Sequence, residues 1–176
     1  MRTRMIVGLA GFLAAGTASW AADKAAPAVD GKAVLERMKG LAGHWRGNVT
    51  TEDGPPAEVV YTVTAGGSAV EEKLFPGTPH EMVSMYHLDG GDLVLTHYCA
   101  MGNQPRMRLV SASEGNPAQL RFDFAGGTNV DPAKDMHMHA GLITLRGADR
   151  LDAEWAVWDK GKQVGANKFF LARAKR

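Results

Sequence analysis

Leu41-Ala42-Gly43-His44-Trp45-Arg46-Gly47 follows a short amphipathic segment and opens a long series of extended runs. Residues 32–39 carry apolar side chains at helical spacing, and Asp30 is a suitable N-cap for that helix. A helix this short is marginal alone and needs a surface on which to dock. A Gly-x-Trp at the head of antiparallel strands indicates a small closed β-barrel, with the helix lying across one open end.

Alternating apolar and polar residues, separated by turn residues, predict about nine or ten strands. The extended runs cover 43–51, 58–65, 68–75, 81–88, 92–100, 106–113, 119–125, 136–146, 150–158 and 163–172. Because no helical pattern interrupts them, we expect an all-β, antiparallel up-and-down barrel of the lipocalin or calycin type rather than a parallel sheet. Residues 126–135 form the one long irregular connection, which we expect to be a flap at the barrel mouth.

The N-terminus is typical of a secretory signal peptide. Arg2 and Arg4 precede an apolar run at 5–18, and small residues predict cleavage after Ala21. We therefore expect a periplasmic or secreted protein with a signal peptide at 1–21, a flexible lead-in at 22–31 and one barrel domain at 32–176. The apolar run is shorter than the about 20 residues that cross a bilayer, so no transmembrane span is expected.

Charge and motif content exclude several classes of function. The chain has 20 Lys and Arg against 19 Asp and Glu, a formal net charge of +1, which argues against a nucleic-acid partner. Cys99 is the only cysteine, so no internal disulfide forms. The chain has no glycine-rich phosphate loop, Gly-x-Ser-x-Gly, His-Glu-x-x-His or Cys-x-x-Cys motif, and catalysis is not expected. The cofactor and the oligomeric state are left unknown.

The sequence resembles the calycin superfamily, which includes the lipocalins. The resemblance rests on residues 43–47, the helix before them and the closing Phe169-Phe170-Leu171-Ala172-Arg173, and it covers about Leu35 to Arg173. Residues 86–99 look more specifically like bacterial secreted lipocalin-like domains of unknown function. The resemblance implies that Trp45 closes one end of the barrel and that Arg173 stacks on its indole in a cation–π contact. It also implies a ligand held in the lumen.

Strand alternation selects the side chains that face the lumen. The ligand-binding candidates are His97, Cys99, Met107, Phe122, Phe124, Met138 and Trp155, with Arg106 at the rim. Arg106 belongs to a polar loop at 103–106, which either orients a polar group of the ligand or is an ordinary hairpin loop. Of Glu71 and Glu72, one carboxylate either points inward as an anchor or lies on the surface. Together these residues predict binding of a small, largely apolar molecule without catalysis.

The segment Met136-His137-Met138-His139 carries donors that suit copper. Strand alternation separates its thioethers from its imidazoles, so we expect the two Met inside and the two His on the outer surface. Apolar groups on both faces of 136–146 leave the inward face of that strand ambiguous. Three alternatives stay open: a copper or haem barrel using His97, His137 and His139, an enzyme of the calycin type centred on His97 or Cys99, and a filled barrel with a structural role.

Overall fold

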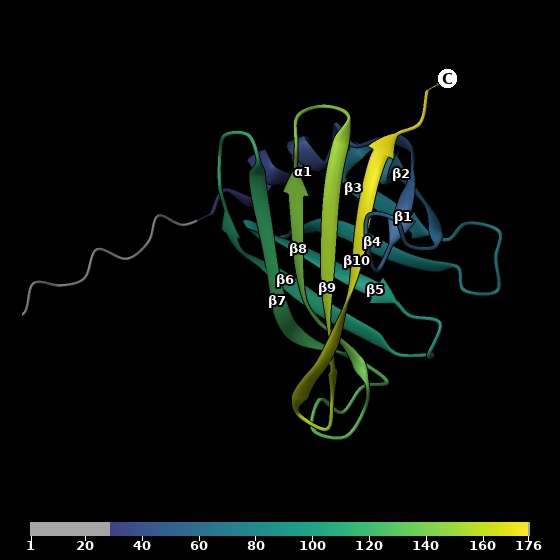
Figure 1. Ribbon diagram of the computed structural model, residues 1–176. Helices are drawn as coiled ribbons and strands as arrows, with labels where there is room; N and C mark the ends of the chain where they lie inside the picture. Colours follow the sequence, from purple (N-terminus) through teal and green to yellow (C-terminus); the bar gives the residue numbers. More distant parts are fainter. Residues whose placement is uncertain (1–28, 176) are drawn as a thin grey trace, which may run out of the picture.

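A computed structural model describes residues 29–175, so the predicted signal peptide and its cleavage site lie outside the described residues. Ten antiparallel strands close into a single barrel in which each strand pairs with its neighbours in sequence and β1 pairs with β10 (Figure 1). The expected all-β up-and-down barrel with a preceding helix is thereby confirmed. The elements are α1 (Gly31–Lys39), β1 (Gly43–Val49), β2 (Pro56–Thr64), the 3-10 turn η1 (Ala65–Gly67), β3 (Ala69–Leu74), β4 (Met82–Asp89), β5 (Asp92–Tyr98), β6 (Gln104–Ala112), β7 (Ala118–Thr128), β8 (His137–Leu145), β9 (Arg150–Asp159) and β10 (Lys162–Arg173).

The predicted strand boundaries differ from the observed ones by no more than three residues. The prediction of a polar loop at 103–106 is wrong, because β6 already begins at Gln104. Pro105 is tolerated inside this strand because the register of β6 against β7 shifts between Pro105 and Met107. Strand β7 runs on to Thr128, so the long connection at the mouth is 129–136 rather than 126–135.

Helix α1 covers one end of the barrel, beside β3, β4 and β5 (Figure 1). Asp30 caps it by accepting a hydrogen bond from the Ala33 N–H at 3.1 Å. The apolar face is buried through Val34, Leu35 and Met38. The connections β1–β2, β3–β4, β5–β6, β7–β8 and β9–β10 therefore lie at the opposite end, which α1 leaves uncovered.

Trp45 and Arg173 join the closing strands to the helix. They are direct partners across the β1–β10 seam, and the Arg173 guanidinium lies 4.4 Å from the centroid of the Trp45 ring. Trp45 is fully buried, and its Nε1–H donates to the Leu41 carbonyl at 2.8 Å. Arg173 donates to the carbonyls of Gly40 at 3.0 Å and Ala42 at 2.9 Å. One cation–π pair therefore ties the last strand to the segment that ends α1.

A β-bulge in β8 explains why both faces of that strand carry apolar residues. Met138 pairs with Val157, but the register against β9 shifts between Met138 and Ala140. After the shift, Ile143 pairs with Ala153, and both are buried on the inner face. One extra residue thus reverses the alternation, so that Met138 and Ile143 point to the same side although they are five positions apart.

The interior is occupied by large side chains. The largest side chains that are less than 2% exposed are Trp45, Tyr61, Tyr86, Phe122, Met38, Leu74, Leu93, Leu95, Met107, Leu120, Ile143 and Leu151. This continuous core spans the helix and the inner faces of the strands. Between residues 29 and 175, no helix has the length and apolar character needed to cross a bilayer.

Candidate functional site

A row of polar side chains crosses the inner wall of the barrel from β2 to β5. Tyr61 pairs with Glu72, Glu72 with Ser84, and Ser84 with His97. Because directly opposite residues in antiparallel strands share a face, the four side chains lie side by side. Each is no more than 2% exposed. We call Tyr61, Glu72, Ser84 and His97, together with Tyr86 from β4, the inner polar row.

The carboxyl group of Glu72 is the centre of this row. The Tyr61 hydroxyl donates to Oε1 at 2.7 Å, and the Tyr86 hydroxyl donates to Oε2 at 2.9 Å. Burial raises the pKa of Glu72, while hydrogen bonds from Tyr61, Tyr86 and Ser84 lower it. Burial also raises the pKa of both tyrosines well above the ordinary value, so each keeps the proton that it donates. Of the two glutamates considered from the sequence, Glu72 is the one that points inward.

His97 is the last residue of the row, and only one of its two ring nitrogens has a hydrogen-bond partner among the described residues. Its Nδ1 lies 3.0 Å from Ser84 Oγ. Burial lowers the pKa of His97 to about 4, so the ring is neutral near pH 7. Its Nε2 is buried and has no hydrogen-bond partner among residues 29–175.

Trp155 places a second unpaired polar atom on the inner wall, from β9. It pairs with Gly141, and a Cβ atom on Gly141 would lie 2.3 Å from the six-membered ring of the indole, so the indole lies directly over the glycine. Trp155 is 2% exposed, and its Nε1–H has no partner within the described part of the chain. An indole N–H on β9 and an imidazole nitrogen on β5 are therefore both buried without a hydrogen-bond partner among the described residues.

The other predicted ligand-binding residues are placed as follows. Met107, Phe122 and Met138 are buried, and Phe122 packs edge-to-face on Tyr86 at 5.8 Å between ring centroids. Phe122 also pairs with Gly141, under the Trp155 indole. Phe122 therefore lies between Tyr86 of the inner polar row and the Gly141 position over which the Trp155 indole lies.

Two predicted residues lie away from the inner polar row. Cys99 follows the end of β5 and is half-exposed, with its N–H bonded to the Asn103 carbonyl at 3.1 Å. Strand pairing of β5 stops at Tyr98, so Cys99 is in the β5–β6 turn instead of beside His97 on a strand. Arg106 lies on the surface and forms an ion pair with Asp89 at 2.6 Å.

The expectation that both histidines of 136–139 lie on the outer surface is wrong for His137, which is fully buried. Its Nδ1 lies 2.8 Å from the Asp135 carbonyl, and its Nε2 lies 2.9 Å from Nδ1 of His139. The His139 ring stacks between Trp158 at 3.8 Å and Phe124 at 4.8 Å. These aromatic contacts withdraw the histidines from water, which strand alternation alone does not predict.

His139 shows the electrostatic effect of this aromatic packing. Burial lowers its pKa, and the neighbouring His137 lowers it further.

Met136, the other residue expected inside the barrel, is 45% exposed. The two histidines contact each other, whereas His97 on β5 is hydrogen-bonded to Ser84 on β4. Among the described residues, no group of three or more His, Cys, Asp or Glu side chains is arranged to hold a metal ion.

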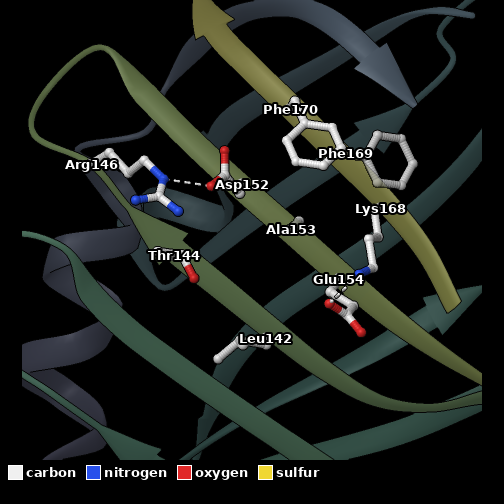
Figure 2. A pocket seen from close by; sticks show the side chains of 9 residues that line it. All are labelled: Leu142, Thr144, Arg146, Asp152, Ala153, Glu154, Lys168, Phe169 and Phe170. Carbon is white, nitrogen blue, oxygen red and sulfur yellow. Dashed lines mark hydrogen bonds and ion pairs between the residues drawn. The ribbon is translucent and has the colours of Figure 1, made fainter. Parts of the chain in front are cut away.

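The main surface hollows lie elsewhere. Figure 2 shows one of them, over the outer side of β8, β9 and β10, where Arg146 faces Asp152 and Lys168 lies beside Glu154. The charged groups of this hollow are paired with each other. None of the five main hollows of the described residues is lined by Glu72, His97 or Trp155. The inner polar row therefore opens into none of these hollows.

Sequence comparison adds no assignment to this geometry. No protein-family model matches the chain. No curated protein matches it either. The closed antiparallel barrel is compatible with a calycin-like fold.

Strand alternation and the motifs of the sequence do not identify Tyr61, Ser84 and Tyr86 as site residues. Each occupies an ordinary position in a strand. The signal that identifies them is the register that sets Glu72 opposite Tyr61 and Ser84, because a buried carboxyl group needs donors on the facing strands.

Proposed function

We propose that this protein binds a small, largely apolar molecule inside the barrel, with the polar group of that molecule beside the inner polar row. The observation that carries the proposal is that two of the three buried, unpartnered side-chain atoms among the described residues, His97 Nε2 and Trp155 Nε1, lie on the inner wall. An unsatisfied buried polar group costs about 1–3 kcal/mol, so folded proteins rarely retain one without a reason. A bound molecule that carries a polar group offers the missing partner.

The surrounding wall suits an apolar body. Phe122, Met107 and Leu95 are fully buried next to the row, and Met138 follows toward the uncovered end of the barrel. Methionine side chains are flexible and fill irregular space, so they can rearrange around an entering molecule. The end opposite α1 gives the route, because no helix covers it in the described residues.

The test uses the purified protein and a neutral apolar fluorophore, N-phenyl-1-naphthylamine. We expect saturable, one-to-one binding that Trp155→Phe weakens about tenfold, since the variant keeps an aromatic ring but loses one hydrogen bond to a buried group. Trp158→Phe, which alters an indole outside the inner polar row, is the matched control. Native mass spectrometry of gently purified protein provides an independent reading as a bound small-molecule mass. Absence of both fluorophore binding and any bound mass would contradict the proposal.

We also propose that the protein acts outside the cytoplasm. The support is the basic residues Arg2 and Arg4, the apolar run at 5–18 and the small residues before the expected cleavage after Ala21. Intact mass of the protein from the extracytoplasmic fraction of a bacterial host tests this proposal. We expect a chain that starts at Ala22, and a full-length chain confined to the cytoplasm would contradict it.

A further inference from the structure

We infer that the molecule bound in the barrel is a neutral carbonyl compound, an apolar ketone, ester or amide, whose oxygen accepts a hydrogen bond from Nε1–H of Trp155. This inference rests on the proposed function and narrows it to one class of ligand. It depends on the chemistry of the indole, because the indole N–H donates a hydrogen bond and never accepts one.

The N–H of the Trp155 indole is turned away from the neighbouring strand β8. A Cβ atom on Gly141 would come closest to Cζ3 and Cε3 of the indole, which are on the ring edge opposite Nε1. Trp155 is buried, and its N–H has no hydrogen-bond partner among residues 29–175. An unused donor on the inner wall costs about 1–3 kcal/mol, and an acceptor oxygen on a bound molecule removes that cost.

Asn167 supplies a second polar group beside this N–H. It pairs with Trp155 across β9 and β10, and directly opposite residues of antiparallel strands share a face. Asn167 is exposed, whereas Phe169, the next residue of β10 on that face, is buried. The inner face of β10 therefore becomes accessible to solvent at Asn167. Its amide group can donate to the same carbonyl oxygen that accepts from Trp155.

The end of β1 explains why this part of β10 is accessible. Val49 is the last residue of β1, and it pairs with Phe169, so Asn167 has no partner on β1. The β9–β10 hairpin continues past this point at the end of the barrel that α1 leaves uncovered (Figure 1). An apolar molecule can therefore reach Trp155 from the uncovered end, along the inner face of β10.

The surroundings of Trp155 favour a neutral oxygen over a carboxylate. Lys168 and Glu154 are on the opposite face of β9 and β10 and form an ion pair with each other at 3.4 Å. The neighbours of Trp155 on the inner face of these two strands carry no charge; they are Ala153, Val157, Gly165 and Phe169. A buried carboxylate without a cation is costly, whereas a carbonyl oxygen brings neither a charge nor a proton that needs an acceptor.

The binding test compares 2-acetylnaphthalene with 2-isopropenylnaphthalene, which have the same shape and differ in a carbonyl oxygen against a methylene group. We expect the affinity of the ketone relative to the alkene to fall about tenfold in Trp155→Phe, because the hydrogen bond to the oxygen is lost. Using the ratio cancels the cost of removing the ketone from water. Trp158→Phe, outside the inner wall, is the matched control and should keep the wild-type ratio. An unchanged ratio in Trp155→Phe overturns this inference and leaves the binding proposal intact, while a wild type that binds neither compound contradicts both.

A second measurement uses only the wild-type protein. Proton–nitrogen-15 NMR resolves the indole N–H groups, and that of Trp45, which donates to the Leu41 carbonyl at 2.8 Å, is the hydrogen-bonded reference. We expect saturating ketone to move the Trp155 N–H proton downfield, and saturating alkene to lack this effect. Equal positions of the Trp155 signal in the two complexes overturn the inference.

Discussion

At the scale of single residues, Glu72 shows how a carboxyl group is held inside an apolar barrel. Its burial is offset by two tyrosine hydroxyl groups at 2.7 Å and 2.9 Å. A hydrogen bond contributes about 0.5–1.5 kcal/mol, and removing the carboxyl group leaves several buried hydroxyl groups unsatisfied at once. The stability of this region therefore depends on the group as a whole.

We expect the loss of one hydrogen-bond donor of the row to cost less stability than the loss of the Glu72 carboxyl group. Tyr61→Phe should lower the free energy of unfolding by about 1–3 kcal/mol, because one donor is lost. Glu72→Leu should lower it by about 3–5 kcal/mol, because the partners are left unpaired. Chemical denaturation measures both, with Tyr98→Phe, at a 50% exposed tyrosine, as the control. Equal effects of Glu72→Leu and Tyr98→Phe would contradict the described row.

The histidine of the row predicts a pH dependence of stability. The pKa of His97 falls from 6.5 to about 4 on folding. Below pH 6.5 the unfolded state binds a proton that the folded state refuses, so the free energy of unfolding falls as the pH falls from 6.5 to 4. The shift corresponds to about 3 kcal/mol across this window. Glu72 acts in the opposite direction, because its pKa is raised on folding and its protonation favours the folded state.

Comparison of variants separates these two contributions. His97→Gln should remove the destabilisation between pH 6.5 and 4 and keep the part that belongs to Glu72. His80→Gln alters an exposed histidine and should leave the wild-type profile unchanged. Melting temperatures across this range provide the measurement. A wild-type profile in His97→Gln would show that the imidazole titrates normally in the folded protein.

At the scale of elements, the bulge in β8 and the glycine beside it determine the inner wall. The bulge brings Met138 and Ile143 to the same side, and Gly141 leaves room for the Trp155 indole. The same strand carries His137 into its contacts with His139 and Phe124. The bulge and the glycine of one strand thus position both the Trp155 indole and the His137–His139 pair.

Gly141→Ala tests this close approach. A Cβ atom there would lie 2.3 Å from the indole of Trp155, so we expect a loss of about 1–3 kcal/mol from overpacking. Gly165→Ala is the matched control, since a Cβ atom at Gly165 meets nothing within 4 Å. In Gly141→Ala with Trp155→Leu, the second change should recover part of the loss caused by the alanine. An alanine at position 141 without effect would mean that the indole lies elsewhere.

At the scale of the whole molecule, closure depends on the β1–β10 seam and on the helix beside it. Arg173 contacts the Trp45 ring and donates to the carbonyls of Gly40, Ala42 and Ala148. It therefore joins α1, the first and last strands and the β8–β9 turn at one point.

Arg173→Met should cost about 2–4 kcal/mol, because the cation–π contact and the charge-assisted hydrogen bonds to three carbonyl groups are lost together. Arg173→Lys should be intermediate, since an ammonium keeps the charge but cannot reproduce the planar fork. Arg106→Met removes only an exposed ion pair with Asp89 and should change stability by less than about 1 kcal/mol. Equal stability of Arg173→Met and Arg106→Met in thermal unfolding would contradict this role.

Local patterns in the chain are enough to predict about nine or ten strands, their order and approximate limits, the cap helix and the antiparallel class. These depend on local alternation and turn residues such as Asp89-Gly90-Gly91, which act within a few positions of the chain. The sequence also identified His97, Phe122 and Trp155 as inward side chains from the same alternation. The same patterns did not predict that Cys99 lies beyond the end of β5, that His137 is buried or that β8 contains a bulge.

The contacts among the inward side chains depend on strand pairing between distant parts of the chain. Tyr61, Glu72, Ser84 and His97 come from four strands, and the register that aligns them depends on pairing across the whole barrel. The bulge in β8 leaves only an ambiguous pattern in the sequence, with apolar residues on both faces of 136–146, so periodicity does not locate it. The sequence likewise does not show that Nε2 of His97 lacks a hydrogen-bond partner, because the presence of a partner depends on residues distant in the chain.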